Sequence, residues 1–455
     1  MPEERLHSTW LHSDRFIPAR FLRPVLHFTR VEAAGGLVLL AATVAALIWA
    51  NLPFTDSYRL FWESSVDVGI GAFALHETLR GLVNDGLMAI FFFVVGLEIK
   101  RELVHGELQD PRAASLPVLA AVGGMAVPAV IYLGFAAGSG AAHGWAIPVA
   151  TDIAFSLGVL ALLGNRVPVG ARLFLLTLAI ADDIGGIAVI ALAYTKGIRL
   201  WWLLGSLATL AAIWAAGRVK VRSLTFYGLA AFAAWLCVLE SGVHATLTGV
   251  ALALLTPATA LYGDEQYRDR ARRILGGYEA DAAAPHGRER VDQAALALAA
   301  IARESVSPLD RLDGALHPWS SFVVVPIFAL ANAGVRFAGI DLADAATHPV
   351  TLGVAAGLVL GKIVGITAFT WLAVRLGWGH LPRSTGWRHV VGLAAVAGIG
   401  FTVALFIAGL AFTDPVLADR AKLGIFAGSL LAGLVGYAVL RLTRPGGEPG
   451  SAEET

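Results

Sequence analysis

Twelve long apolar windows constrain what this chain can fold into more than any other feature of its sequence. A helix needs about 20 predominantly apolar residues to cross a bilayer core of about 30 Å, and the windows have about that length. We therefore predict an all-α polytopic membrane protein with about 12 transmembrane helices. The windows are 33–52, 82–98, 115–135, 145–163, 171–194, 200–216, 223–239, 242–257, 319–335, 350–374, 389–412 and 422–441.

The composition excludes a soluble globular protein. Hydrophobic residues make up 57% of the chain and charged residues only 15%, against about 25% in ordinary soluble domains. The single cysteine, Cys237, excludes a disulfide framework and a cysteine-ligated metal cluster. Lys and Arg number 34, as do Asp and Glu, so the net charge of zero gives no reason to expect nucleic acid as a partner. We expect no cofactor and no enzymatic activity.

The distribution of basic residues predicts the orientation of the spans. With the N-terminus inside, 26 Lys and Arg residues fall in cytoplasmic segments and seven in external ones. Omitting the eight in the long loop at 258–317, which reports orientation poorly, leaves 18 against seven. Both ends of the chain are therefore expected in the cytoplasm. The remaining basic residue, Lys362, lies inside the tenth window.

These assignments divide the chain into five parts. The loop before the ninth window contains an alanine-rich amphipathic stretch at 289–305, which we expect to form a cytoplasmic helix. The parts are a cytoplasmic N-terminal segment at 1–32, spans 1–8 at 33–257, the cytoplasmic loop at 258–317, spans 9–12 at 318–441, and a disordered cytoplasmic tail at 442–455.

Four ionisable residues lie within the predicted spans. They are Asp152 in the fourth, Asp182 and Asp183 in the fifth, and Lys362 in the tenth. An ionisable group within hydrocarbon costs about 2.5–3.5 kcal/mol, so each indicates a specific partner or a water-filled path. A structural ion pair between two helices is one interpretation. It suits the adjacent aspartates less well, because pairing one acid leaves the other exposed to the same cost.

The adjacent aspartates also suggest a binding site. Asp182 and Asp183 point about 100° apart on a helix, so one can meet a counter-charge while the other faces an aqueous cavity. Carboxylate oxygens bind hard cations such as sodium, and the same oxygens bind protons. Competition between a proton and a cation for one site is the minimum requirement for exchanging them across a membrane.

Two of the spans contain helix-breaking residues. Pro148 precedes Thr151 and Asp152 in the fourth span, and Gly398 and Gly400 interrupt the eleventh. Because proline removes a helical hydrogen bond and glycine weakens a helix, we expect both spans to be broken. Spans 3–5 and 10–12 each contain such a middle helix and run in opposite orientations. We interpret them as the inverted-topology repeats of a secondary transporter.

From about residue 29 to about residue 440, the sequence resembles the NhaA family of sodium/proton antiporters. That family is itself an established example of inverted repeats, so the resemblance and the repeat are not independent. The matching motifs are FFFVVGLEIKREL at 91–103, VATDIAFSLGVLALLGNRVP at 149–168, LAIADDIGGIAVIALAYT at 178–195, SGVHATLTG at 241–249, LHPW at 316–319, FALANAGV at 328–335, GLVLGK at 357–362 and AGIGFT at 397–402.

The resemblance implies a bacterial inner-membrane protein that exchanges cytoplasmic Na+ or Li+ for external H+. It implies electrogenic, pH-regulated transport in sodium and pH homeostasis. By matching motif, Asp183 is the principal ligand of Na+ or Li+ and Asp182 its partner, while Lys362 forms an ion pair that breaks as the cation binds. Thr151 and Asp152 would lie where the broken helices cross. There Asp152 would offset the N-terminal helix dipoles and Lys362 the C-terminal ones.

The resemblance also indicates a group of residues that respond to pH. Because Glu98, Arg101 and Glu102 share one helix face, as on any solvated helix end, a purely structural role stays open. His244 is a further candidate, since histidine titrates near neutral pH, although a lone histidine is often a packing residue. The pH-response candidates are Glu98, Arg101, Glu102, His244, Asp313 and His317, of which His317 also suits a helix start before Pro318.

The loop between the eighth and ninth spans departs from the family pattern. It has about sixty residues where short members have a brief basic link, and Asp310, Arg311, Leu312 and Asp313 replace a segment that carries a histidine of the pH-response group. The region 66–80 corresponds to the external hairpin of the family's homodimer contact. Its alternation of apolar and polar residues is poor, so the expected homodimer depends on the resemblance.

Two other functions are alternatives to cation/proton exchange. A cation-coupled solute symporter has the same inverted-repeat architecture, but an anionic solute would need a basic pocket, and Lys362 lies among three acids. An intramembrane aspartyl protease also needs two aspartates, yet such sites take them from separate helices, whereas Asp182 and Asp183 are adjacent. No HExxH metalloprotease motif is present.

Overall fold

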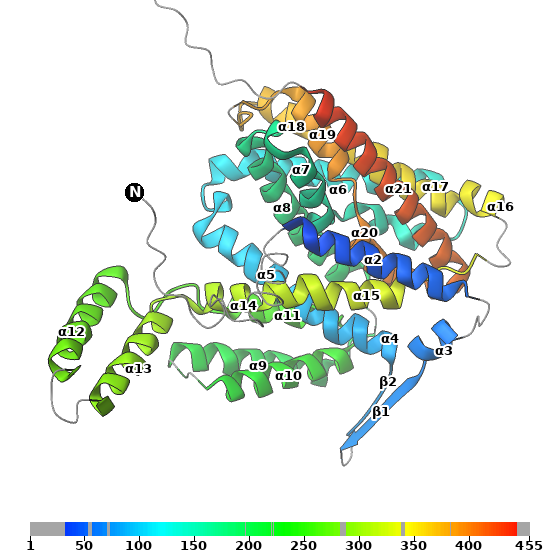
Figure 1. Cartoon of the computed structure of the whole chain (residues 1–455). Coiled ribbons are helices and arrows are strands. Elements are labelled where there is room, and N and C mark those ends of the chain that lie inside the picture. The colour runs from blue at the N-terminus through cyan, green and yellow to red at the C-terminus, as the bar shows by residue number, and fades with distance from the viewer. Residues whose placement is uncertain are drawn as a thin grey trace, which may run out of the picture.

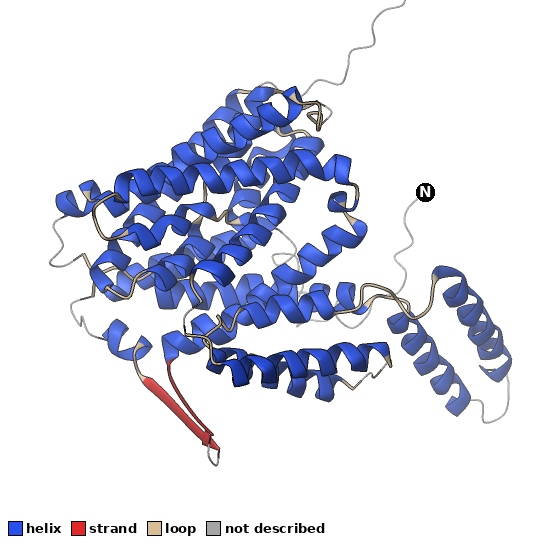
Figure 2. Ribbon diagram, turned by 180° about the vertical axis from the view of Figure 1, so that it is seen from behind, coloured by secondary structure: helices blue, strands red, loops and turns tan. Residues whose placement is uncertain are grey.

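The computed structural model describes residues 32–443, apart from 53–56, 71–72, 196, 220, 222, 283–287, 338–341 and 383. The predicted N-terminal segment and C-terminal tail therefore lie almost wholly outside the described residues. Within the described part, helices form one bundle, and two hairpins project from it, one helical and one of β-strands (Figure 1). Figure 2 shows the same arrangement from behind, with the two strands in red.

Eight helical segments in the described residues are long and apolar enough to cross a membrane, and a bent pair makes up to nine. The chain is therefore a multi-pass membrane protein. The eight are α4–α5 (Leu79–His105), α6 (Pro111–Ala136), η5–α7–η6 (Ala142–Arg166), α8 (Val169–Ala193), α9 (Leu200–Arg218), α14–α15 (Pro308–Asn332), α17–α18 (Pro349–Arg375) and α21 (Pro415–Leu442). The pair is α19 (Trp387–Val396) and α20 (Phe401–Ala411), bent by 49°.

Three of the twelve predicted spans are not among these candidates. They correspond to α2 (Glu32–Ala50), α10 (Leu224–Ser241) and α11 (Leu247–Leu255). At 1.5 Å per residue, the nine residues of α11 extend only about 14 Å, which is less than the thickness of a bilayer core. The described residues thus confirm a mostly helical membrane protein, while the total of about 12 spans and the inverted repeats stay predictions.

Two hairpins lie outside the bundle. Helices α12 (Asp264–Ala282) and α13 (Arg288–Glu304) pack against each other where an amphipathic helix was expected at 289–305. Strands β1 (Ser65–Ile70) and β2 (Phe73–Thr78) pair antiparallel, with Ser65 opposite Thr78. The all-α prediction is therefore incomplete, because it gave no strand to the region 66–80. Three short helical segments, α3 (Ser57–Trp62), η4 (Glu107–Gln109) and α16 (Leu342–Thr347), also lie outside the long spans.

Small residues let α6 and α18 (Lys362–Arg375) pack at close range. A Cβ atom added to Gly123 would overlap the Gly365 carbonyl oxygen, and one added to Gly365 would overlap that of Gly123. A Cβ atom on Gly361 would lie 2.7 Å from the Pro128 Cα atom. Small residues drive such approach in membranes, where lipid supplies no hydrophobic force between helices. This contact fixes the position of Lys362, the first residue of α18.

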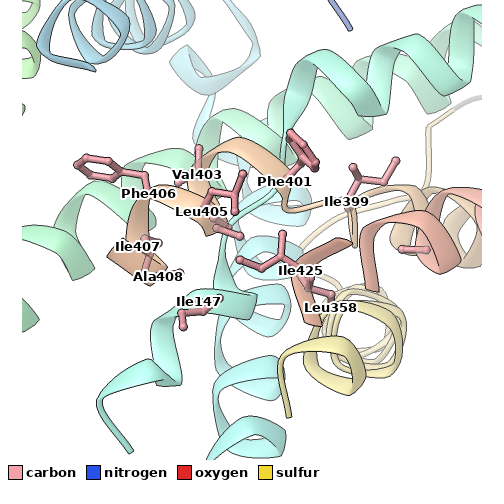
Figure 3. Packing of buried hydrophobic residues seen from close by; sticks show 14 of the residues in the cluster. Ile147, Leu358, Ile399, Phe401, Val403, Leu405, Phe406, Ile407, Ala408 and Ile425 are labelled. Atoms are coloured by element: carbon pink, nitrogen blue, oxygen red, sulfur yellow. The ribbon is translucent and has the colours of Figure 1, made fainter. Parts of the chain in front are cut away.

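The core of the bundle surrounds α20. The first eight residues of that helix are buried, and its aliphatic and aromatic side chains pack against η5 and α21 (Figure 3). The π-helical segment η8 (Gly357–Gly361) contributes Leu358, and η5 contributes Ile147. The broken span formed by α19 and α20 therefore lies largely in the interior of the bundle.

Candidate functional site

The two interrupted spans meet at their breaks. Segment η5 (Ala142–Val149) is a 3-10 helix containing Pro148, and the chain is extended at Ala150 and Asp152 before α7 (Ile153–Leu163) begins. The facing break separates the end of α19 from the start of α20. The backbone N–H of Asp152 donates to the Ile399 carbonyl oxygen at 2.6 Å. Backbone groups freed by one break are therefore satisfied by the other, as buried irregular backbone requires.

Side chains reinforce this crossing. The Thr151 hydroxyl donates to the Ala397 carbonyl oxygen at 2.8 Å, and the Ser156 hydroxyl donates to that of Val396 at 3.1 Å. Both acceptors lie at the C-terminal end of α19, where helical carbonyl groups lack intrahelical partners. These bonds join the fourth span to the eleventh.

Asp152 caps two half-helices at once. One carboxylate oxygen accepts from the Phe155 N–H at 3.1 Å, in the first turn of α7. The other accepts from the Thr402 N–H at 3.1 Å and from the Thr402 hydroxyl at 2.6 Å, in the first turn of α20. Asp152 is only 3% exposed. Its negative charge is thus buried between the positive ends of two helix dipoles, which stabilise it.

Lys362 connects this crossing to α8. Its ammonium group lies 2.7 Å from an Asp182 carboxylate oxygen and donates to the Thr151 hydroxyl at 3.0 Å. The Lys362 and Asp182 side chains are completely buried. Lys362 directly follows the π-helical turn η8, a widened turn of a kind often found at functional sites. The site therefore joins spans 4, 5 and 10.

The two adjacent aspartates have different environments. Asp182 forms the ion pair with Lys362, and its second carboxylate oxygen has no hydrogen-bond partner within the described part of the chain. Asp183 lies outside that ion pair and is half-buried. An unpartnered buried carboxylate oxygen beside a second carboxylate offers oxygen ligands to a small hard cation or to a proton.

A second group of predicted residues lies where α5 (Met88–His105) meets α14 (Pro308–Trp319). Arg101 reaches a carboxylate oxygen of Asp313 at 2.7 Å and one of Asp310 at 3.1 Å. The His317 Nδ1 atom lies 3.0 Å from a Glu98 carboxylate oxygen. The structure thus brings together four of the six residues proposed for pH response.

The other two pH-response candidates lie elsewhere. The Glu102 carboxylate accepts from the Glu107 N–H at 2.8 Å and borders an open pocket of about 580 Å³. The His244 Nε2 atom lies 2.9 Å from the Tyr194 carbonyl oxygen, between α10 and α11. Neither contact includes Glu98, Arg101, Asp313 or His317.

Sequence reasoning missed two contributors to these sites. Thr402 donates both its N–H and its hydroxyl to Asp152, although the sequence showed only that it follows a glycine-rich break. Asp310 accepts from Arg101, and its own N–H is capped by the Ser307 hydroxyl at 3.0 Å. The spacing of Ser307 and Asp310 is a helix-start signal that could have identified the beginning of α14.

The sequence that carries these residues is similar to sequences of known antiporters. Residues 26–440 match the family described as Na+/H+ antiporter 1. The Na+/H+ antiporter NhaA 2 of Syntrophotalea carbinolica is 47% identical over 421 residues, which cover 92% of this chain and 96% of the relative. The NhaA protein of Rhodopirellula baltica is 44% identical, with coverage of 94% and 95%. That of an Anaeromyxobacter species is 48% identical, with coverage of 93% and 92%.

Proposed function

Because the chain belongs to the Na+/H+ antiporter 1 family, we propose that it exports sodium ions from the cytoplasm in exchange for external protons. The named activity of its relatives and the buried oxygen ligands on α8 support this proposal. We further propose that it acts in the bacterial inner membrane with both termini in the cytoplasm, where the bias of basic residues favours them.

The cation would bind at Asp183 and Asp182. Asp183 lies outside the ion pair, so once its proton leaves, its carboxylate can bind a sodium or lithium ion without first breaking that pair. Asp182 would supply a second oxygen on the same helix. Because a proton and a cation use the same oxygens, binding of one displaces the other, and this competition couples the two movements.

Lys362 would make the exchange electrogenic. A cation that draws the Asp182 carboxylate to itself removes the partner of the buried Lys362 ammonium, which lies 2.7 Å away. One bound cation then displaces two protons, one from Lys362 and one from Asp183. When the cation leaves, the ion pair forms again. Movement of two protons against one monovalent cation transfers net charge.

Thr151 and Asp152 would stabilise the crossing of the broken helices both when the cation is bound and when it is absent. Asp152 offsets the positive ends of α7 and α20. The Thr151 hydroxyl accepts a hydrogen bond from Lys362 and donates one to a carbonyl group at the C-terminal end of α19, so it links the positive charge to the negative end of that helix. The broken helices can then shift together without leaving a helix end uncompensated. In this role Asp152 contributes to exchange by compensating helix ends, and it does not need to contact the transported ion.

We also propose regulation by pH and assembly as a homodimer. Glu98, Arg101, Asp313 and His317 form a titratable cluster between α5 and α14, and these two helices belong to spans 2 and 9. The β1–β2 hairpin projects from the bundle and offers a strand edge to a second copy (Figure 1). A symporter for an anionic solute is less well supported, because Lys362 is already paired with Asp182.

Proton movement in everted membrane vesicles tests the proposal. Vesicles acidified by respiration should lose their pH gradient when Na+ or Li+ is added, and should keep it when K+ is added. The measurement should run from about pH 6.5 to about pH 8.5, which spans the usual range of histidine titration. A pH gradient that does not respond to Na+ at any of these values would refute the exchange.

A further inference from the structure

Three side chains between α5 and α14 form a cluster with the geometry of a metal site. Glu98 comes from α5, and Asp313 and His317 come from α14. One potential ligand atom from each lies within 4.8 Å of the other two. Asp313 and His317 are four residues apart, so they share one helix face. Two ligands of one tetrahedral metal ion are about 3.4 Å apart, so small side-chain rotations would bring all three into contact with it.

A buried oxygen without a partner gives a second reason to expect a ligand here. The Asp313 side chain is only 8% exposed, and its Oδ1 atom has no hydrogen-bond partner among the residues that the structure describes. Its Oδ2 atom is 2.7 Å from Arg101, which also holds Asp310. Arg101 therefore orients the Asp313 carboxylate and leaves one oxygen free, as outer partners do for ligating carboxylates.

The charges in the cluster also favour a divalent cation. Glu98, Asp310 and Asp313 contribute three negative charges, and Arg101 contributes one positive charge. With His317 neutral, as a metal ligand requires, the sum is two negative charges. A divalent ion neutralises this sum, whereas a monovalent ion leaves one negative charge uncompensated. His317 is 58% exposed on its side chain, so an ion can reach the cluster.

We propose that Glu98, Asp313 and His317 bind a divalent transition-metal ion of the zinc type. One imidazole nitrogen and two carboxylates are a common ligand set for Zn2+, whereas Mg2+ favours oxygen ligands and retains its water. The bound ion bridges α5 and α14 and clamps span 2 to span 9. The clamp slows ion exchange, and this consequence, unlike the binding itself, rests on the proposed function.

Titration of the purified full-length protein with ZnCl2 tests the binding. The melting temperature of the wild type in detergent should rise saturably with Zn2+, because a ligand that binds the folded state stabilises it. His317→Gln removes the nitrogen ligand at an exposed position and should abolish the rise. His380→Gln is the matched control, since His380 is also exposed but lies in the loop that follows α18, and it should behave as the wild type.

Glu98→Gln gives a second, independent variant. It keeps the shape of the side chain and its acceptor oxygen for His317, but it removes one charge, and it should weaken Zn2+ binding at least tenfold by calorimetry. An equal response of the wild type and His317→Gln to Zn2+, an equal response to MgCl2, or no saturable binding would each overturn the proposal.

Vesicle transport separates this inference from the proposed function. Micromolar Zn2+ should inhibit Na+-dependent proton movement in the wild type and in His380→Gln, and should spare His317→Gln. Sodium exchange that proceeds in a wild type unable to bind Zn2+ overturns only the metal site. Saturable Zn2+ binding by a protein without exchange activity overturns only the proposed function.

Discussion

The Lys362 ammonium group lies 2.7 Å from an Asp182 carboxylate oxygen, and neither side chain has any solvent exposure. The pair joins α18 to α8, and the Thr151 hydroxyl joins it to the crossing of the broken spans. Separating the two charges would leave each of them buried without a partner. Under the proposed function, the ion pair should therefore persist until another cation replaces Lys362 at the carboxylate.

The stability of this pair can be measured by a double-mutant cycle. Lys362→Met leaves the Asp182 carboxylate buried and unpaired, and Asp182→Asn does the same to the ammonium. Each single change should lower the free energy of unfolding by about 3–5 kcal/mol. The double variant should recover most of this loss. Denaturation in detergent micelles measures all four proteins, and losses that simply add in the double variant would show that the two residues are not coupled.

The crossing depends on Thr402. Thr402→Val keeps the volume of the side chain but removes the 2.6 Å hydrogen bond to Asp152, which should cost about 1.5–3 kcal/mol of unfolding free energy. Thr367→Val is the matched control on α18, because the Thr367 hydroxyl is buried and has no partner among the described residues. Thermal unfolding should show a lower Tm for the first variant and an unchanged or raised Tm for the second. Equal effects would contradict the capping role of Asp152.

The close approach of α6 to α18 depends on glycine. A Cβ atom on Gly123 would overlap the Gly365 carbonyl oxygen, so Gly123→Ala should push the helices apart and cost about 1–3 kcal/mol. Gly134→Ala lies on the same helix and would meet nothing within 4 Å. That control should be neutral, or stabilising by up to about 1 kcal/mol. Comparison of their Tm values checks the prediction, and a Gly123→Ala protein as stable as the control would contradict it.

Which aspartate pairs with Lys362 could not be predicted from the sequence. The windows located α8 and α18 because their composition differs sharply from that of the loops. Asp182 and Asp183 are chemically identical neighbours, so only the rotation of α8 about its axis decides which of them meets Lys362. That rotation is set by packing against other helices, so it cannot be deduced from the sequence of α8 alone.

Two elements differ from their predicted positions for similar reasons. The ninth span was expected to begin at 319, but α14 begins at Pro308, where Ser307 caps it, and the charge of its Asp313 is compensated by Arg101 of α5. The segment therefore looks like a polar loop until its partner on α5 is known. The fold class included no strands, although the resemblance indicated an external hairpin at 66–80, because apolar residues alternate in β1 but not in β2.

Activity should depend on pH through His317 more than through Glu102. Protonated His317 pairs with Glu98, beside Asp313 and Arg101, and holds α5 against α14 at low pH. Under the proposed regulation, the imidazole should lose its charge as pH rises, so the attraction should weaken and exchange should accelerate. His317→Gln should therefore retain exchange at lower pH than the wild type in vesicle assays. Glu102→Gln should leave the pH profile in place, and the reverse pattern would remove His317 from the regulation.

The most direct test of the account is exchange by Asp183→Asn. This change removes the charge of the proposed principal cation ligand but leaves the Lys362–Asp182 ion pair intact, so the protein should fold and insert normally. In everted vesicles, addition of Na+ should discharge the pH gradient with the wild type and should have no effect with Asp183→Asn. Sodium-dependent discharge of equal size and sodium affinity in both proteins would contradict the proposed site.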